Sequence, residues 1–193
     1  MLRRFKQYFQ KITKAHSQRR QKIMTIDQHI VTVGPTNYYV SRALITDVPE
    51  MLAIEKAVYA GKTPWDENAF KTELRRQSGR FYIVMRHNDR LCAFCGCAFD
   101  DRRQDAHITN IAVHPDFQNQ GLGRFMMQAM IKRATYLNYR TVTLEVRYSN
   151  VAAQRLYTGI GFEKAGIKKR YYFGDHEDAI DMTYHLPVAT TDD

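Results

Sequence analysis

Apolar residues recur along the chain with two different periods, which predicts a mixture of strands and helices. Residues 38–45 and 141–148 alternate with the two-residue period of a strand, whereas 122–136 repeats apolar residues at the spacing of an amphipathic helix. The runs 81–88 and 90–100 are rich in strand-forming residues and flank a short polar turn, so they predict a hairpin. The other expected elements are helices at 49–59, 67–77 and 151–160, and strands at 107–113, 162–173 and 178–186.

Capping residues support the expected helix boundaries. Asp47, with Glu50 three residues later, has the spacing of a capping box, in which each side chain accepts from the backbone N–H of the other residue. Asp66 and Asn150 stand directly before two other helices, where a side-chain oxygen can accept from an unpaired N–H group. Gly61 follows the first helix and is expected to end it.

The order of the expected elements, β-α-α-β-β-β-α-β-α-β-β, determines the fold class. Consecutive strands form hairpins, so the sheet is expected to be mostly antiparallel rather than doubly wound and parallel. We predict an α/β (α+β) domain, with a mixed, mostly antiparallel central sheet of about six or seven strands and about four helices on its faces. The expected boundaries are a basic N-terminal extension and linker at 1–37, the domain at 38–188 and a short tail at 189–193.

Positive charge is concentrated at the N-terminus. The 193-residue chain has a formal net charge of +9, and residues 1–24 contribute eight Lys or Arg and no Asp or Glu, so the rest is close to neutral. Hydrophobic residues make up 44% of the chain, which is enough for the core of one domain. No apolar run approaches the roughly 18 to 20 residues that span a bilayer, which argues against an integral membrane protein.

The role of segment 1–24 is left open by the sequence. Leu2, Phe5 and Phe9 have helical spacing among the positive charges, which is typical of a basic amphipathic helix that contacts RNA, a ribosome or an anionic membrane. A solvated extension and a transit peptide are the alternatives, since an isolated helix of this length is only marginally stable. Met24 also stands where a second translation start would remove the segment.

Cys92, Cys95 and Cys97 lie close together in an apolar run. Their spacing is that of part of a metal site, but no second pair of Cys or His follows at a suitable distance, so no metal is expected. Free cysteines are often buried, which favours an ordinary buried strand. The odd number of thiols and the lack of a secretory signal predict a reducing, cytoplasmic location.

The segment QNQGLGR, residues 118–124, stands between an expected strand and an expected helix. Gly121 and Gly123 have no Cβ atom, so a large anion can approach the unpaired N–H groups and the positive dipole end at the helix start. Arg124 adds a full positive charge. The segment is therefore a candidate pyrophosphate site, although an ordinary tight turn explains the same glycines. It lacks the pattern of a P-loop and the third glycine of a dinucleotide fingerprint.

The pattern Q-x-x-G-x-G at Gln118, Gly121 and Gly123, preceded by NIAVHP, resembles the acetyl-CoA-binding segment of the GNAT (GCN5-related) N-acetyltransferases. Four further segments resemble the RimI type in particular: 64–70, 144–162, 168–173 and 177–182. Enzymes of that type acetylate the N-terminal alanine of a small-subunit ribosomal protein. The likeness extends from about Tyr39 to Leu186, and the long basic N-terminus is the main departure from the pattern.

This resemblance implies how acetyl-CoA, the expected co-substrate, is bound. In the family, the strand that contains Ile111, Ala112 and Val113 separates from its neighbour, and its free backbone groups hold the pantetheine arm. A backbone N–H near Val113 would polarise the thioester carbonyl. Asn150 matches a position whose amide binds the pantetheine arm, although a helix N-cap explains it equally. The pyrophosphate would lie against Gln118, Asn119, Gln120, Gly121, Leu122, Gly123 and Arg124.

Acetyl transfer to an amine needs two proton transfers. An α-amino group has a pKa of about 8, so at neutral pH it must lose a proton to a base before it attacks. Glu145 is a lone acid in an alternating strand, where a solvent-facing role is commonplace; the resemblance implies that it is the general base. Tyr157, seven positions after Asn150 on nearly the same helix face, is either a core contact or, as the resemblance implies, the general acid for the CoA thiolate.

We therefore expect an N-α-acetyltransferase that modifies a protein N-terminus, with a ribosomal protein that begins with Ala or Ser as partner, by direct attack in a ternary complex. The alternatives are a GNAT enzyme for a small-molecule amine and a catalytically slack acetyl-CoA-binding module tethered by its basic arm. Trp65, Tyr171, Tyr172 and Asp178 are candidates for the acceptor groove, although core and surface roles explain them equally. The oligomeric state does not follow from the sequence.

Overall fold

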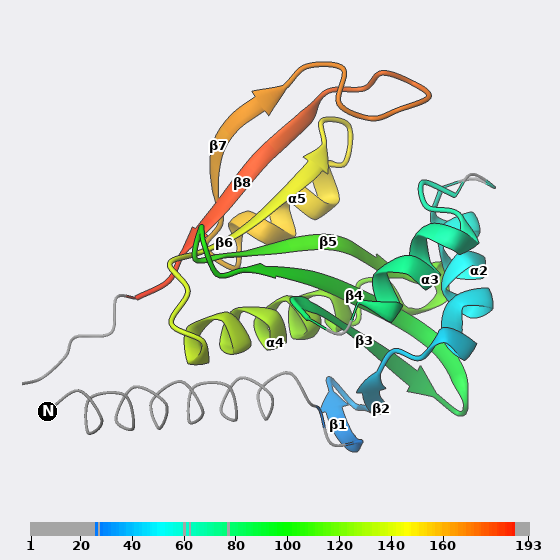
Figure 1. Cartoon of the computed structure of the whole chain (residues 1–193). Coiled ribbons are helices and arrows are strands. Elements are labelled where there is room, and N and C mark those ends of the chain that lie inside the picture. The colour runs from blue at the N-terminus through cyan, green and yellow to red at the C-terminus, as the bar shows by residue number, and fades with distance from the viewer. Residues whose placement is uncertain (1–25, 27, 60, 62, 77, 188–193) are drawn as a thin grey trace, which may run out of the picture.

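The computed structural model describes residues 26, 28–59, 61, 63–76 and 78–187. In this part of the chain, eight strands form one sheet, and four α-helices pack against it (Figure 1). The strands are β1 His29–Val33, β2 Thr36–Arg42, β3 Arg80–His87, β4 Arg90–Asp100, β5 Asp105–Val113, β6 Thr141–Arg147, β7 Glu163–Lys168 and β8 Ala179–His185. The helices are α2 Val48–Val58, α3 Glu67–Arg75, α4 Leu122–Tyr136 and α5 Val151–Thr158, with short 3₁₀ turns η1 Ile45–Asp47 and η2 Pro115–Phe117.

The sheet order is β1-β2-β3-β4-β5-β6-β8-β7. Each neighbouring pair is antiparallel except β5 and β6, which are parallel. The expected closing hairpin is present, with β8 beside β6 and β7 at the edge. The predicted fold class, a mixed and mostly antiparallel sheet with helices on its faces, is therefore confirmed.

Strands β5 and β6 pair only where they begin. Residues 105–107 pair with 141–143, and no pairing continues beyond them. Further along, β5 stays beside β4 while β6 leaves with β8 and β7, so the sheet divides into two diverging arms (Figure 1). A register shift between β4 and β5 at Gly96 marks a bulge, which bends a strand locally. A Cβ atom at Gly96 would lie 2.1 Å from the Tyr82 ring, so this position requires glycine.

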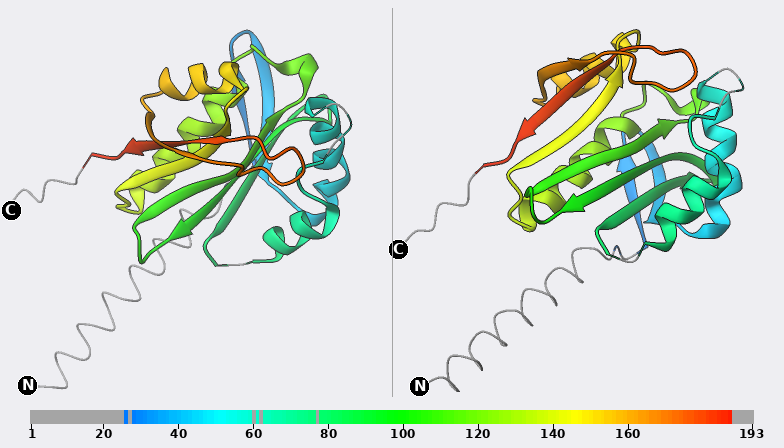
Figure 2. Two further views of the ribbon diagram at one scale, coloured as in Figure 1. Left: turned by 90° about the horizontal axis from the view of Figure 1, so that it is seen from above. Right: turned by 45° about the horizontal axis from the view of Figure 1, so that its top comes forward.

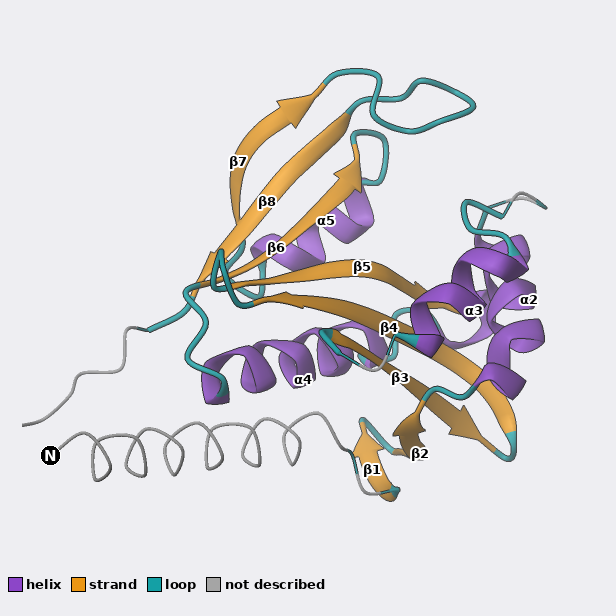
Figure 3. Ribbon diagram, in the orientation of Figure 1, coloured by secondary structure: helices purple, strands orange, loops and turns teal. Residues whose placement is uncertain are grey.

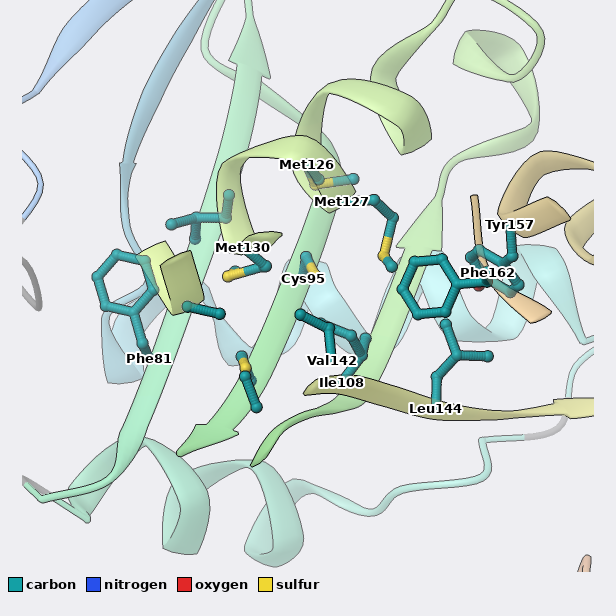
Figure 4. Close-up of a cluster of buried hydrophobic side chains, with 14 of the residues drawn as sticks. Phe81, Cys95, Ile108, Met126, Met127, Met130, Val142, Leu144, Tyr157 and Phe162 are labelled. Carbon is teal, nitrogen blue, oxygen red and sulfur yellow. The ribbon is translucent and has the colours of Figure 1, made fainter. Parts of the chain in front are cut away.

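Helices cover the sheet on both faces. The larger core lies under α4 and α5, where Met126, Met127 and Met130 pack on strand residues and Tyr157 (Figure 4). A smaller core lies under α2 and α3, on the opposite face (Figure 2). In β6 the buried positions alternate with half-buried ones, so Glu145 projects from the face that α4 and α5 do not cover.

The start of the sheet differs from the expectation. The segment expected to be a linker, VGPTNY at 33–38, forms the turn of a hairpin, in which β1 pairs with β2. This pairing adds one strand to the number expected. The strand expected at 38–45 is displaced toward the N-terminus and becomes β2.

One of the expected helix caps is wrong, and two are confirmed. Asp47 makes no side-chain capping bond to α2; its carboxylate accepts from the Leu44 N–H at 2.7 Å and stabilises η1 instead. Asp66 caps α3 by accepting from Ala69 N–H at 2.7 Å. Asn150 caps α5 in the same way. Such a cap needs a non-helical backbone conformation, as Asp66 and Asn150 have, whereas Asp47 is helical because η1 precedes it.

The three cysteines are buried in β4, as expected. Among the described residues, no group of three or more His, Cys, Asp or Glu side chains has a metal-binding arrangement. None of the helices in the described ranges is long and apolar enough to cross a membrane. The expectations for residues 1–24 and for the tail at 189–193 fall outside the described residues.

Candidate active site

The glycine segment forms the turn that leads into α4. Gly121 is the N-cap of this 15-residue helix and has a φ of +92°, a left-handed conformation that residues with a Cβ atom rarely adopt. The N–H groups of residues 120–124 have no hydrogen-bond acceptor within the part of the chain that the structure describes. Five successive donors at the positive end of a long helix make this turn suitable for binding a phosphate-containing anion.

Glutamine side chains hold the main chain of this turn in place. Gln118 Nε2 donates to the Val113 carbonyl at 3.1 Å and ties the turn to the end of β5. Gln120 Nε2 donates to the Asp116 carbonyl at 3.0 Å, and its Oε1 accepts from the Tyr38 hydroxyl at 2.9 Å. Both glutamines therefore shape the turn, in addition to any contact that they make with a ligand.

Several of the predicted binding residues can offer a ligand only their main chain. The side chains of Leu122 and Ala112 are buried in the core. Arg124 is exposed, and its Nη1 donates to the carbonyl of Gly159 at the end of α5, at 3.0 Å. Arg124 thus connects α4 to α5 while its charge stays beside the turn.

A narrow channel of about 130 Å³ opens where β5 and β6 separate. It brings together the predicted residues Ile111, Glu145, Asn150 and Tyr157, which come from three different elements and a cap. The opposite side is formed by α2 and by the segment that precedes α3. The residues that line the channel include Glu55, Pro64, Trp65, Asn110, Ile111, Glu145, Arg147, Asn150, Tyr157 and Tyr172.

Glu145 lies on β6 just beyond the last β5–β6 pair, and both of its oxygens have partners. Lys168 Nζ lies 2.5 Å from Oε1, and His107 Nε2 lies 3.2 Å from Oε2. Burial alone would raise the pKa of Glu145, but the hydrogen bonds and electrostatic attraction of His107 and Lys168 outweigh it and lower the pKa to about 2. Glu145 is therefore an ionised, largely buried carboxylate and not a simple solvent-facing strand residue.

The partners of Glu145 belong to a larger polar network on the uncovered face. Lys168 also contacts Asp181, at 2.8 Å; burial would lower the pKa of this lysine, but the two carboxylates raise it. His107 Nδ1 lies 3.0 Å from the Thr143 hydroxyl, which in turn donates to an Asp105 oxygen at 2.6 Å. An open groove of about 790 Å³ follows this network and meets the channel at Glu145.

Tyr157 makes a core contact and also lines the channel. Its ring is buried and packs against Phe162 with ring centroids 5.9 Å apart, which is a core contact. Its side chain also lines the channel. Burial raises the pKa of the Tyr157 hydroxyl, so this group holds its proton at neutral pH, as a proton donor must.

Asn150 likewise lines the channel and caps a helix. Its Oδ1 accepts from Ala153 N–H at 3.1 Å, which confirms the N-cap. Its Nδ2 has no partner among the residues that the structure describes, so the amide retains a donor for a ligand.

The loop that joins β7 to β8 is drawn in teal in Figure 3. It borders the channel through Tyr172 and is held by ion pairs to Arg147. The Arg147 guanidinium stacks 4.1 Å from the Tyr172 ring centroid and pairs with Asp175 and Glu177 at 2.8 and 2.7 Å. Tyr172 lines the channel. Asp178 does not: its carboxylate binds Lys169 and the Arg170 N–H within the loop, which is the surface role considered above.

Residues 47–162 match the acetyltransferase (GNAT) family. The matched region includes the turn at 118–124, both diverging strands, and α5 with Tyr157. The chain belongs to the GNAT family of acetyltransferases.

Relatives of this GNAT protein are N-acetyltransferases. It is 38% identical over 147 residues to the [ribosomal protein bS18]-alanine N-acetyltransferase of Salmonella typhimurium, covering 75% of this chain and 93% of that one. It is 30% identical over 161 residues to the N-alpha-acetyltransferase RimI of Mycobacterium tuberculosis, covering 82% and 95%. The crystal structure of the ribosomal-protein-S18-alanine N-acetyltransferase from Escherichia coli superposes with a TM-score of 0.70 at 32% identity, covering 80% and 97%. The GNAT protein is therefore an N-acetyltransferase, and the resemblance seen in its sequence is confirmed.

Three side chains of this GNAT site were missed from the sequence. His107 and Lys168 contact Glu145 but come from β5 and β7, far from it in the chain. The alternating pattern of β5 and β6 places His107 and Glu145 on the same face of the sheet, and this pattern was the available indication for His107. Glu55 is wholly buried in α2, and no local motif distinguishes it from the polar residues of an amphipathic helix.

Proposed function

We propose that this protein is an acetyl-CoA-dependent N-α-acetyltransferase of the RimI type, which modifies an N-terminal alanine or serine of a ribosomal protein. The observation that carries the proposal is the channel between β5 and β6, which places Ile111, Glu145 and Tyr157 around one small space. The names of the relatives, which act on the alanine of ribosomal protein bS18, support the choice of acceptor.

Acetyl-CoA supplies the acetyl group as an activated thioester, and this chain offers main-chain groups to hold it. The edge of β5 at Ile111, Ala112 and Val113 has no partner strand on the side of the channel and can hold the pantetheine arm as an added strand would. A backbone N–H near Val113 would polarise the thioester carbonyl. The donors of residues 120–124 would bind the pyrophosphate.

Glu145 is proposed to take the proton of the acceptor amine, directly or through a water molecule. An arriving α-ammonium group is a cation and can replace Lys168 on one oxygen of Glu145. Lys168 keeps its second carboxylate partner, Asp181, so its charge stays paired when it releases Glu145. His107 remains on the other oxygen and maintains the orientation of the carboxylate.

Tyr157 is proposed to give its hydroxyl proton to the departing thiolate of CoA. The amine attacks the thioester directly, and no acyl group is carried by the enzyme. The buried cysteines support this route, since burial raises the pKa of Cys95 and Cys97 and suppresses the reactive thiolate form.

Transfer of labelled acetyl groups to defined acceptors tests the proposed function. Peptides that begin with Ala-Arg or Ser are expected to gain one acetyl group at the α-amine, whereas the same peptides with blocked N-termini and free polyamines are not. Tyr157→Phe is expected to slow turnover by about tenfold or more. Turnover of small amines without peptides would replace this function with the small-molecule one, and salt-sensitive RNA binding without any turnover would identify a binding module.

The basic segment 1–24 lies outside the described residues, and we propose that it attaches the enzyme to ribosomal RNA. Its support is the concentration of eight Lys or Arg without an acid. Deleting the segment is expected to leave turnover of a short peptide unchanged and to weaken salt-dependent co-sedimentation with ribosomes. Equal sedimentation of both forms, or binding to anionic vesicles alone, would contradict this role.

A further inference from the structure

Glu55 is a wholly buried carboxylate beside the channel, and the proposed chemistry does not use it. It lies in the last turns of α2. Its Oε1 accepts from Asn110 Nδ2 at 2.7 Å, and its Oε2 accepts from the Trp65 N–H at 3.3 Å. Burial raises the pKa of Glu55, and the bonds from Asn110 and Trp65 oppose this rise.

Burial of a carboxylate is costly unless it is well compensated. Among the described residues, no Lys, Arg or His lies within ion-pair distance of Glu55, so its two hydrogen bonds are its compensation. Glu50 on the same helix differs: it lies on the outer side, where it binds Arg86 and the Leu91 N–H. An apolar side chain at position 55 would avoid the cost of burying a carboxylate. The presence of a carboxylate there therefore indicates that its two hydrogen bonds have a role.

The two partners of Glu55 both line the channel and come from separate parts of the chain, the segment before α3 and strand β5. Trp65 and Pro64 form the side that faces β5, here called the acceptor wall, and Trp65 is anchored below by its ring on Phe70, with centroids 5.4 Å apart. Asn110 belongs to the diverging half of β5, next to Ile111, where the donor is proposed to bind. Glu55 thus connects the acceptor wall to the donor strand by one hydrogen bond on each side.

We propose that Glu55 is a positioning residue that holds the acceptor wall at a set distance from β5 and thereby restricts the acceptor to N-termini with a small first side chain. This inference rests on the proposed function. The channel is small, about 130 Å³, which favours an acceptor whose first side chain is small. A wall that is free to move would admit larger first residues and would bind small ones less well.

Peptides that differ only in their first residue test this role. Glu55→Ala removes both bonds and is expected to lower the ratio of kcat/KM for an Ala-first peptide over a Leu-first peptide by about tenfold or more, mainly through KM. Binding of acetyl-CoA is expected to stay within about twofold of the wild type. Glu55→Gln can still accept from the Trp65 N–H and, once the Asn110 amide rotates, can donate to it, so it is expected to keep the wild-type ratio.

Glu50→Ala is the matched control, because it removes polar contacts from the same helix away from the channel. The proposal would be overturned if Glu55→Ala kept the wild-type ratio of kcat/KM for the Ala-first over the Leu-first peptide. It would also be overturned if Glu50→Ala lowered this ratio as much as Glu55→Ala does. A decrease of this ratio in Glu55→Gln as large as in Glu55→Ala would also overturn the proposal, since the effect would then depend on the charge of Glu55 and not on its two hydrogen bonds. If Glu55→Ala does not fold, Asn110→Ala removes one bond and is expected to lower the ratio in the same direction.

Trp65 gives a second measurement that does not depend on any acceptor, because it is the only tryptophan of the chain. Glu55→Ala is expected to shift its fluorescence to the red and increase quenching by acrylamide, whereas Glu55→Gln and Glu50→Ala are not. Unchanged fluorescence in Glu55→Ala overturns the positioning role even if peptides are acetylated. Changed fluorescence with turnover of small amines alone would overturn the proposed function while supporting the contact between Glu55 and the acceptor wall.

Discussion

The donor side and the acceptor side of the channel are built in different ways. The donor side consists of main-chain groups: the free edge of β5 and the N–H groups of residues 120–124. The acceptor side consists of side chains from distant elements, of which Glu145 with Lys168 and His107 is the clearest example. A main-chain site depends on local conformation, whereas a site of ion pairs depends on how separate strands are brought together.

This difference predicts how each side fails when it is altered. On the donor side, a substitution acts through backbone conformation, so its effect falls on binding of acetyl-CoA. On the acceptor side, a substitution changes charge or proton affinity, so its effect falls on turnover and on pH dependence. The following variants test this distinction, from the largest expected effect to the smallest.

Glu145→Gln is expected to have the largest effect, a fall in kcat of about 10²–10⁴-fold, because it removes the proton acceptor and keeps the shape of the side chain. The affinity for acetyl-CoA, measured by calorimetry, is expected to stay close to that of the wild type. Asp181→Asn is the control: it alters the other carboxylate partner of Lys168 and leaves Glu145 in place. Wild-type kcat in Glu145→Gln would exclude its role as base.

Gly121→Ala is expected to weaken binding of acetyl-CoA by about tenfold and to cost about 1–2 kcal/mol of stability, because alanine is strained at a φ of +92°. The added Cβ atom would also approach Val33 Cγ1 to 3.1 Å. Gly34→Ala serves as control, since Gly34 has a φ of +59° with no atom near its Cβ position. A loss of acetyl-CoA affinity in both variants would show that strain alone, and not the turn, is responsible.

Lys168→Met is expected to shift the pH dependence of kcat/KM. Lys168 helps to lower the pKa of Glu145 to about 2, so its removal raises that pKa and moves the acid limb of the profile to higher pH. The ordinary pKa of Glu is near 4.5, so the wild-type pair stabilises the fold fully above that pH and less as the pH falls toward about 2. The difference in Tm between Lys168→Met and the wild type should therefore shrink at low pH. Lys164→Met, on an exposed position of the same strand, should leave the profile unchanged.

Tyr38→Phe is expected to have the smallest effect, a rise of about two- to fivefold in the KM for acetyl-CoA, since one hydrogen bond to Gln120 contributes about 1 kcal/mol. The kcat for peptides should stay the same. The neighbouring Tyr39→Phe also loses a hydroxyl bond, to Gln28, but on the exposed side of the sheet. Equal KM values for the two variants would show that the hairpin of β1 and β2 does not support the turn.

The parts of the fold that depend on local patterns were predicted well. The helix bounds of α4 and the caps at Asp66 and Asn150 follow from residues close in the chain, which interact in any compact state. The expected capping box at Asp47 is absent. Glu50 instead binds Arg86 and the Leu91 N–H, which belong to a hairpin distant in the chain, and Asp47 binds the Leu44 N–H. Tertiary contacts of this kind cannot be inferred from the local sequence pattern.

The chemistry of the site shows the same division. By itself, the sequence determined the glycine turn at 118–124, which we propose binds the pyrophosphate, because glycine conformation and unpaired N–H groups at a helix start are properties of a few consecutive residues. Only the tertiary structure decided that Glu145 is held by His107 and Lys168 and that Glu55 is buried beside the channel. Those contacts form where β5 and β6 separate, and ion pairs between strands depend on that geometry and not on spacing along the chain.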